Sequence, residues 1–390
     1  MVPNNINSLV GFYQDYQHAL SSRDYQMVLR TVLSHVREEG LILPHPTKRG
    51  LLSRCYNSKK EGLSNLLFFD DGDGKNRWAA IQVNNFLNAI VVKDAFYMFK
   101  PSPVNAVKRA VHSIVDNSML IDENNKGDIS KNFGGFIVSQ GLPYHYFYDA
   151  LVNFLELRRH RNALSAVDEA KHRFVDLNSV LGCAYKGEAS PTCYYVYPSI
   201  IAGRFLFGRN DEFMRRVDHM ERRLHDMTLT IDAPETISTI KENKGPGTIA
   251  FWFGVSNGKR KWHQQIDGCI SIVRYFERQN RHVIVVLDGI TARHGLAIDD
   301  HPDKVIENGI FQHLSGNERV SLVSLIGKDY TTKINVCKEL DFFIAYEGTG
   351  AFVPLRVCRK PGILHSNEVL TALPGDYGGS VIMLRGDSDQ

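Results

Sequence analysis

Short apolar runs and longer helical segments alternate through the second half of the chain, and this alternation restricts the folds that the chain can adopt. Each apolar run is too short for a typical helix and has the composition of a buried strand. Parallel strands need a crossover connection, usually a helix, so the alternation predicts a parallel, doubly wound α/β sheet. The runs are 248–254, 282–287, 320–325 and 342–345, and the expected helices are 264–279, 304–314 and 331–340.

A glycine-rich turn, Glu-Gly-Thr-Gly at 347–350, follows the last of these runs. Its glycines let the backbone turn sharply and bring N–H groups close to a ligand. A helix over 351–358 would direct its N-terminus at the strand end, which favours an anion, and a strand at 362–364 would deliver His-Ser-Asn at 365–367. This predicts a ligand crevice at the carboxyl edge of the sheet. The alternative interpretation is an ordinary strand-to-helix turn that binds nothing.

Polar residues also follow the other three runs. The first run ends in a basic loop, 255–265, whose cations can neutralise a diphosphate and whose Trp262 can stack on a base or pack beneath the loop. The second run ends at Asp288, a suitable acceptor for ribose hydroxyls, and the third at Gly327 and Lys328. The carboxyl ends of parallel strands meet at one edge of a sheet, so these groups are predicted to line the same crevice. A solvated loop without a ligand is the alternative for 255–265.

The first half of the chain begins with a helical pattern over 8–39 that breaks at 21–24. This predicts a helical hairpin that caps a domain core. Strands are expected at 66–69, 78–83 and 89–99.

The connection between the first two of these strands, 70–76, is rich in Asp and Gly, which suits a turn with positive φ values. Asp71 and Asp73 also match the Asp-x-Asp pattern of metal sites that hold nucleotide diphosphates. The hairpin explanation needs no ligand, and we expect no metal here.

A second informative segment joins an expected strand, 136–138, to an expected helix, 144–159, through a glycine-proline turn. His145 and Asp149 are four residues apart, so they share one face in the first turn of that helix. A carboxylate that touches an imidazole there can tune a general base. In the alternative interpretation, His145 bonds a backbone carbonyl and Asp149 stabilises the helix N-terminus.

The length of 390 residues suggests two domains, and the polar stretch 231–247 is the preferred boundary, giving domains 1–244 and 245–390.

The net charge of +3 does not indicate nucleic acid, but it fits anionic substrates or membrane surfaces. We expect a cytoplasmic protein, because no segment has the apolar length to cross a bilayer and the N-terminus lacks a signal-peptide pattern. The six cysteines lack metal-ligand spacing.

This layout resembles the GT-B fold of sugar-nucleotide glycosyltransferases, with two Rossmann-like domains, here preceded by a helical hairpin. The chain lacks GxGxxG after the first run, GxxxxGK[ST] and GxSxG, which weighs against dehydrogenases, P-loop NTPases and α/β-hydrolases. The C-terminal half is similar to heptosyltransferase-like enzymes, in which a basic first loop and a late Thr-Gly turn contact the donor. The matching positions are 258–262 and 348–350, although Asp-Thr-Gly is typical there and this chain has Glu-Gly-Thr-Gly. Segment 144–149 is similar to glycosyltransferase family sixty-one.

The resemblance implies transfer of a sugar from a nucleotide-activated donor to a glycan or lipid-linked acceptor, in the synthesis of bacterial capsule or lipopolysaccharide. Arg260, Lys261 and the 348–350 backbone would stabilise the leaving phosphate without a metal or cofactor. Asp149 or His145 would deprotonate the acceptor hydroxyl in an inverting displacement. The implied donor-binding residues are Ser256, Lys259, Arg260, Lys261, Trp262, Gln265, Asp288, Lys328, Glu347, Gly348, Thr349, Gly350, His365, Ser366 and Asn367.

The implied partners are a nucleotide sugar and a glycan or lipid-linked acceptor, and a lipid-linked acceptor would bring the protein to the inner face of the membrane. Two alternatives stay open. One is a pyruvyl or phosphate-sugar transferase on the same architecture, and the other is a non-catalytic nucleotide- or glycan-binding protein.

Overall fold

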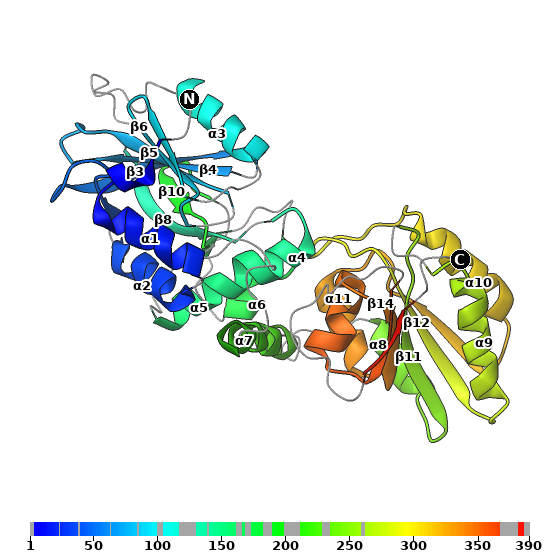
Figure 1. Ribbon diagram of the computed structural model, residues 1–390. Helices are drawn as coiled ribbons and strands as arrows, with labels where there is room; N and C mark the ends of the chain where they lie inside the picture. The colour runs from blue at the N-terminus through cyan, green and yellow to red at the C-terminus, as the bar shows by residue number, and fades with distance from the viewer. Residues whose placement is uncertain are drawn as a thin grey trace. The chain divides into compact units, whose positions relative to one another are not determined.

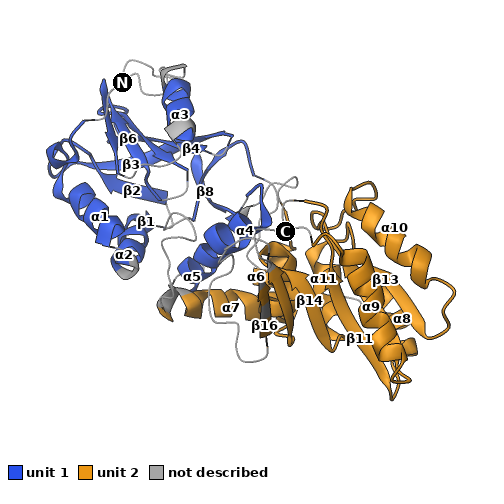
Figure 2. Ribbon diagram, turned by 45° about the vertical axis from the view of Figure 1, so that its right-hand side comes forward, with its two compact units in different colours: residues 1–172, 183–208 blue, residues 173–182, 209–390 orange. Residues whose placement is uncertain are grey.

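The chain forms two compact units in the computed structural model (Figure 2). Unit 1 contains residues 1–172 and 183–208, and unit 2 contains residues 173–182 and 209–390. The described residues are 4–22, 24–37, 40–62, 64–83, 86–99, 104–116, 130–138, 140–160, 166–167, 173–181, 189–198, 211–227, 235–258, 262–366 and 381–385.

The predicted boundary between residues 244 and 245 falls inside unit 2, because α7 (Asp211–Met227) packs with the C-terminal part of the chain. Glu221 on α7 forms a buried, two-point ion pair with Arg356, with N···O distances of 2.8 and 3.1 Å. Lys338 Nζ also donates to the carbonyl of His225, at 2.8 Å. The polar stretch 231–247 contains a helix, α8 (Glu235–Asn243), and lies inside unit 2 rather than at its edge.

Unit 1 contains a seven-stranded sheet whose neighbouring strands are all antiparallel, which corrects the expectation of a Rossmann-like N-terminal domain. The strands follow one another in chain order through short connections, and such connections can only join antiparallel neighbours. The expected strand 89–99 is two strands, because the chain turns at Lys93, where φ is 51°. The strands are β1 (Val36–Arg37), β2 (Gly40–Pro44), β3 (Leu52–Glu61), β4 (Ser64–Asp70), β5 (Trp78–Gln82), β6 (Ala89–Val92) and β7 (Ala95–Met98).

Helices cover both faces of this sheet (Figure 1). On one face, α3 (Val104–Asp116) packs Val107 and Ile114 into a core that it shares with β4 and β5. On the other face, Tyr13 of α1 (Gly11–Ser22) lies edge-on to Trp78, and its hydroxyl donates to the carbonyl of Pro44. The next helix, α2 (Tyr25–His35), begins at Asp24, whose carboxylate accepts from the N–H of Met27. A short 3-10 turn, η1 (Ile6–Ser8), precedes α1.

A second, smaller sheet in unit 1 is parallel, in the order β10-β8-β9. Its strands are β8 (Asn132–Ile137), β9 (Ala166–Val167) and β10 (Cys193–Val196). After β8 the chain forms α4 (Pro143–His145), a π-helical turn η3 (Tyr146–Leu151) and α5 (Val152–His160). The expected helix 144–159 is thus present, but with a widened turn in its first part.

Unit 2 contains a six-stranded parallel sheet in the order β13-β12-β11-β14-β15-β16, which confirms the predicted parallel C-terminal sheet. Counted within this sheet, the order is 3-2-1-4-5-6, the arrangement of the doubly wound dinucleotide-binding fold. The strand order reverses between β11 and β14, and ligands bind at such a switch point, outside the carboxyl ends of the strands. The strands are β11 (Thr248–Gly254), β12 (His282–Asp288), β13 (Val320–Ser324), β14 (Phe342–Tyr346), β15 (Gly362–Ser366) and β16 (Val381–Arg385).

Helices α9 (Gln265–Glu277) and α10 (Asp303–Leu314) pack on one side of the unit 2 sheet through a shared apolar core (Figure 1). Phe251, Val285 and Ile310 are fully buried in that core. The other α-helices among the described residues of unit 2 are α6 (Leu177–Leu181), α7, α8 (Glu235–Asn243) and α11 (Tyr330–Lys338). Among the residues that the structure describes, no helix is long and apolar enough to cross a membrane.

Candidate functional site at the carboxyl edge of the unit 2 sheet

The switch point of the unit 2 sheet is bounded by the ends of β11 and β14. The strands approach closely there, because a Cβ added to Gly254 would lie 3.1 Å from the Cβ of Ala345. The chain leaves β11 through Ser256, Asn257 and Gly258, and it leaves β14 through the Glu-Gly-Thr-Gly turn at 347–350. The two predicted segments, about ninety residues apart in the chain, thus leave adjacent strands at the same edge.

The loop after β11 is held by Gln265, the first residue of α9. The amide oxygen of Gln265 accepts from the N–H of Ser256 at 3.1 Å, and its Nε2 donates to the carbonyl of Ser256 at 3.0 Å. The side chain is buried. Gln265 was predicted to bind the donor, but this geometry gives it the role of shaping the loop, and a direct contact with a ligand stays a prediction.

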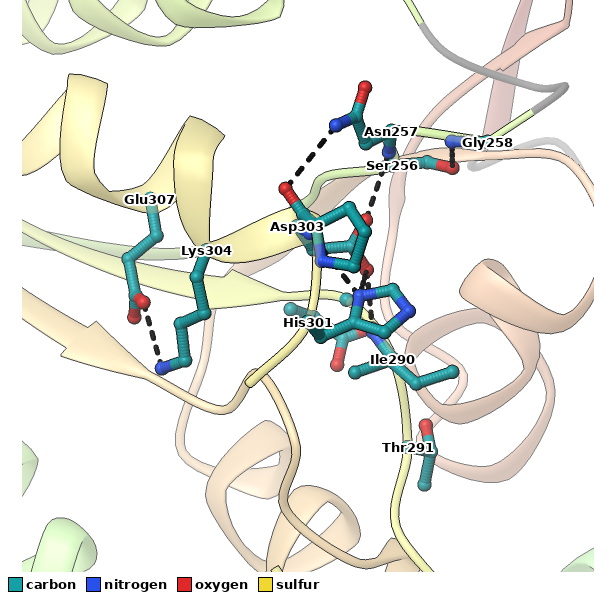
Figure 3. Close-up of polar contacts among 12 residues, drawn as sticks. Ser256, Asn257, Gly258, Ile290, Thr291, His301, Asp303, Lys304 and Glu307 are labelled. Atoms are coloured by element: carbon teal, nitrogen blue, oxygen red, sulfur yellow. Dashed lines mark hydrogen bonds and ion pairs between the residues drawn. The ribbon is translucent and has the colours of Figure 1, made fainter. Parts of the chain in front are cut away.

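Asp303, the first residue of α10, connects the ends of β11 and β12, and it is not among the residues predicted for the site (Figure 3). Its two carboxylate oxygens accept from the N–H groups of Asn257 and Ile290, both at 2.9 Å. His301 Nδ1 lies 3.2 Å from the same carboxylate. Gly289 permits this approach, since a Cβ there would be 2.7 Å from Asp303 Oδ2. A signal was present in the sequence, because an acidic residue directly after Pro302 is typical of a helix start.

Asp288, at the end of β12, forms a buried ion pair with Lys333 of α11, with an Nζ···Oδ1 distance of 2.5 Å. Burial raises the pKa of Asp288 to about 6, and it lowers the pKa of Lys333. The ammonium group also donates to the carbonyls of Gly289 and Ile290 and to the hydroxyl of Thr291. Asp288 therefore anchors the strand end, and its predicted contact with a ribose stays a prediction.

The glycine-rich turn at 347–350 adopts a backbone that needs glycine. Gly348 has a φ of 106°, and a Cβ on Gly350 would lie 2.4 Å from the ring of Tyr346. Glu347 is buried and its N–H donates to the carbonyl of His365, whereas Thr349 is half-buried.

The segment after this turn is helical, but it is not the expected α-helix over 351–358. It consists of a 3-10 turn, η7 (Thr349–Ala351), followed by a π-helical turn, η8 (Phe352–Val357). Pro354 lies within η8, and proline disfavours regular α-helical bonding because it lacks an N–H.

Trp262 packs against the end of β11 and against α9, and its predicted contact with a base stays a prediction. Its ring lies 6.1 Å from that of Phe253, between ring centroids, and it rests on Gly268 of α9, where a Cβ would be 2.1 Å from the indole. Trp262 also lies 5.6 Å from the ring of His365, at the end of β15. Burial lowers the pKa of His365 to about 4, so its imidazole is neutral near pH 7.

The other predicted residues of unit 2 are placed as follows. Lys328 is exposed. The residue before it, Gly327, has a φ of 78° and lies close to the carbonyl of Ile298, so position 327 cannot hold a side chain. Ser366 ends β15. Lys259, Arg260, Lys261 and Asn367 lie outside the described residues, so their roles stay predictions.

His145 and Asp149 belong to unit 1, and the predicted contact between them is present. The distance from His145 Nδ1 to Asp149 Oδ2 is 2.6 Å, and Asn153 donates to the backbone carbonyl of Asp149 at 2.7 Å. The His145 side chain is 43% exposed, whereas Asp149 is buried. The pair spans the junction of α4 and the π-helical turn η3, and such turns are frequent at functional sites.

The Asp-x-Asp segment of unit 1 forms a hairpin turn between β4 and β5. Asp71 accepts from the N–H groups of Asp73 and Lys75 and from the side-chain amide of Asn76. These bonds support the explanation that requires no ligand. Within the described part of the chain, no cluster of three His, Cys, Asp or Glu side chains could hold a metal ion.

No model of a known protein family matches the chain, and no curated protein matches it. Among solved structures, it is similar to a glycosyl transferase family 9 protein from Veillonella parvula, with 11% identity, a TM-score of 0.32, and coverage of 60% of this chain and 66% of that one. It is also similar to UDP-GlcNAc 2-epimerase from Methanocaldococcus jannaschii, with 11% identity, a TM-score of 0.30, and coverage of 60% and 63%. The chain thus spans just under two thirds of these proteins. TM-scores this low carry no weight for function.

Proposed function

We propose that unit 2 binds the nucleotide part of a nucleotide-activated sugar, and that the protein is a glycosyltransferase acting on a glycan or lipid-linked acceptor. The observation that supports this most is the switch point of the parallel sheet. The ends of β11 and β14 flank it, and they bear the loop that begins at Ser256 and the glycine-rich turn at 347–350. In doubly wound sheets this is where nucleotides bind.

The chemistry of the two segments suits a diphosphate. Turns around glycines expose backbone N–H groups to an anion, and Gly348 has the positive φ, 106°, that such a turn requires. The predicted cations Lys259, Arg260 and Lys261 follow Gly258 directly in the sequence. Charge-assisted hydrogen bonds from such groups to phosphate are about twice as strong as neutral ones.

In the proposed reaction, the acceptor hydroxyl attacks the anomeric carbon of the sugar and the bond from that carbon to the phosphate oxygen breaks. The nucleotide leaves with the electron pair, and its developing charge is stabilised by Arg260, Lys261 and the 348–350 backbone instead of a metal. His145, supported by Asp149, takes the acceptor proton. Attack from the face opposite the leaving group inverts the anomeric centre. We place the acceptor among bacterial surface polysaccharides.

A thermal-unfolding panel of UDP-, GDP-, ADP- and CMP-linked sugars tests the proposal. One class should stabilise the protein by about 2.7 kcal/mol when present at a hundred times its dissociation constant. Arg260→Gln should weaken that stabilisation, whereas Arg278→Gln, at the exposed C-terminal end of α9, should not. If no nucleotide sugar raises the unfolding midpoint, the proposal fails. Binding without sugar transfer to any acceptor would indicate a non-catalytic binding protein.

A further inference from the structure

We infer that Cys337 and Cys358 form a redox modification site. A hydroperoxide oxidises the Cys358 thiol, and Cys337 then displaces the oxygen and forms a disulfide. The cross-link joins the last turn of α11 to the residue that ends η8. This inference goes beyond the proposed function, because it requires neither a nucleotide nor an acceptor.

The two thiols are in contact, although β14, η7 and η8 lie between them in the chain. Both residues are free cysteines, and the Cys337 thiol shares a hydrogen bond with that of Cys358. Cys358 Sγ also lies 3.7 Å from the carbonyl oxygen of Ile334, in the same helix as Cys337. Two contacts therefore place the Cys358 sulfur against the C-terminal half of α11.

The backbone is held in place at both cysteines. The N–H of Cys358 donates to the carbonyl of Val353 at 2.9 Å, and the carbonyl of Cys337 accepts from the N–H of Leu340 at 3.2 Å. Reactive groups that are held in contact have a high effective concentration. We therefore expect rotation of the side chains to bring the sulfurs to the bond length of a disulfide, about 2.05 Å.

The two thiols differ in exposure, and this difference assigns their roles. Cys358 is half-buried, and the next residue, Arg359, is exposed. Cys337 is 0% exposed. A thiol at the surface is the one that meets an oxidant from solvent, whereas a buried neighbour can still attack the oxidised sulfur beside it. Cys358 is therefore the residue that reacts first, and Cys337 is the residue that closes the disulfide.

Two lysine ammonium groups lie at this end of α11. Lys360 donates through Nζ to the carbonyl of Lys338 at 2.8 Å, and Lys338 directly follows Cys337. Burial raises the pKa of the Cys337 thiol, and the charge of Lys360 acts in the opposite direction. Burial lowers the pKa of Lys338, and the charge of a Cys358 thiolate opposes that effect. Cations in this position suit the thiolate, which is the form of cysteine that attacks a peroxide.

The reaction balances with a hydroperoxide as the oxidant. The Cys358 thiolate attacks one peroxide oxygen, the O–O bond breaks, and the other oxygen leaves as water or an alcohol after it takes a proton. The product is a sulfenic acid. The Cys337 sulfur then attacks the Cys358 sulfur, the S–O bond breaks, and the oxygen leaves as water with the Cys337 proton. Each sulfur loses one electron and the peroxide gains both.

The disulfide would close a loop that contains the glycine-rich turn at 347–350, together with β14, η7 and η8. A cross-link of this kind restricts the unfolded chain more than the folded one. The oxidised protein should therefore unfold at a midpoint about 5 °C above that of the reduced protein.

Peptide mapping of the full chain tests the site. The protein is treated with hydrogen peroxide, its remaining thiols are alkylated with N-ethylmaleimide in denaturant, and the digest is analysed by mass spectrometry. We expect a pair of peptides joined through Cys337 and Cys358, about 2 Da lighter than the two thiol peptides together, which dithiothreitol separates. Cys269, a buried thiol on α9, is the internal control and should be recovered in its alkylated form.

Two variants test the assigned roles. In Cys337→Ala the sulfenic acid at Cys358 is no longer converted, so dimedone should label Cys358 after peroxide treatment. In Cys358→Ser the same treatment should leave Cys337 as an unmodified thiol. Labelling of Cys337 in that variant would overturn the order of the two steps.

The mapping of the wild type decides whether the site exists. If Cys358 is recovered as a free thiol, as a higher acid or in a disulfide with another cysteine, and no peptide joins it to Cys337, the inference is wrong. If Cys337→Ala does not fold, the wild-type mapping alone carries the test.

Discussion

Each unit contains a close contact between a carboxylate and a basic side chain, and the two contacts differ mainly in their exposure to water. In unit 2, Lys333 Nζ lies 2.5 Å from Asp288 Oδ1, and the two side chains are 1% and 5% exposed. In unit 1, His145 Nδ1 lies 2.6 Å from Asp149 Oδ2, and the histidine is 43% exposed. The distances are nearly equal, so geometry alone does not distinguish an anchor from a site of proton transfer.

The difference in burial distinguishes the structural anchor from the site of proton transfer. A charge without access to water depends on its partner, and removal of one partner leaves the other uncompensated, which costs about 3–5 kcal/mol. An imidazole that reaches water can exchange protons with a bound substrate and with solvent. We therefore assign the Asp288–Lys333 pair to the stability of the sheet edge, and we propose the His145–Asp149 pair for chemistry.

The largest expected effect is that of Lys333→Met. It leaves the Asp288 carboxylate buried without its cation, so urea denaturation should show a loss of about 3–5 kcal/mol in the free energy of unfolding. Lys328→Met is the matched control, because Lys328 is exposed at the same edge and should change stability by less than about 0.5 kcal/mol. Adding Asp288→Asn to Lys333→Met should restore part of the loss. A loss below about 1 kcal/mol for Lys333→Met would show that the pair is not an anchor.

The sheet of unit 2 could be predicted because its strands leave clear patterns in the sequence. Parallel strands buried on both faces appear as continuous apolar runs, and the helices between them leave a separate periodicity. The expected run 248–254 coincides with β11, and 282–287 differs from β12 by one residue. The expected runs 320–325 and 342–345 likewise correspond to β13 and β14. The edge strand β16 was missed, because it follows a stretch without a helical pattern.

The sheet of unit 1 could not be predicted in the same way. Helices α1 and α3 cover both of its faces, so β4 is buried along most of its length and lacks the alternation that marks an antiparallel strand. The short connection 70–76 held the decisive information, since it leaves no room for a crossover.

The residues that shape the candidate site were missed for a different reason. Asp303 binds the backbone of Asn257, 46 residues earlier, and Lys333 binds Gly289, 44 residues earlier. The sequence shows which residue types follow each strand. It does not show which of these side chains will form hydrogen bonds or ion pairs with one another. Asp288 was predicted as a ligand contact from its place at a strand end, and nothing in the sequence indicated its pairing with Lys333.

A second prediction extends the comparison to Glu221, a third buried carboxylate. Burial raises its pKa from 4.5 to about 7, despite its pairing with Arg356. The folded state then binds more protons than the unfolded state between pH 4.5 and 7, so this carboxylate contributes stability below pH 4.5 that is lost as pH rises through 7. At about 1.4 kcal/mol per pKa unit, the contribution is about 3 kcal/mol at most.

Unfolding of the wild type and of Glu221→Gln across pH 4.5–7.5 measures this contribution. The difference in free energy of unfolding between the two proteins should change with pH, with the wild type losing stability relative to the variant as pH rises. Glu242→Gln, an exposed glutamate on α8, should follow the wild type throughout. Parallel pH profiles for the wild type and Glu221→Gln would show that Glu221 keeps an ordinary pKa.

The smallest effect on stability, and the largest on activity, is expected for His145→Gln. The glutamine amide can still donate to the Asp149 carboxylate, and the site is half-exposed, so the free energy of unfolding should change by less than about 1 kcal/mol. The glutamine side chain cannot take up a proton, so the rate of sugar transfer should fall by about 10²- to 10⁴-fold. The donor is the nucleotide sugar identified by the thermal-unfolding panel, and its binding should be unchanged. His225→Gln, at a half-exposed histidine that also lies beside a carboxylate, is the control and should be fully active. If His145→Gln transfers sugar at the wild-type rate, the exposed pair is structural like the buried one, and exposure does not separate the two roles in this protein.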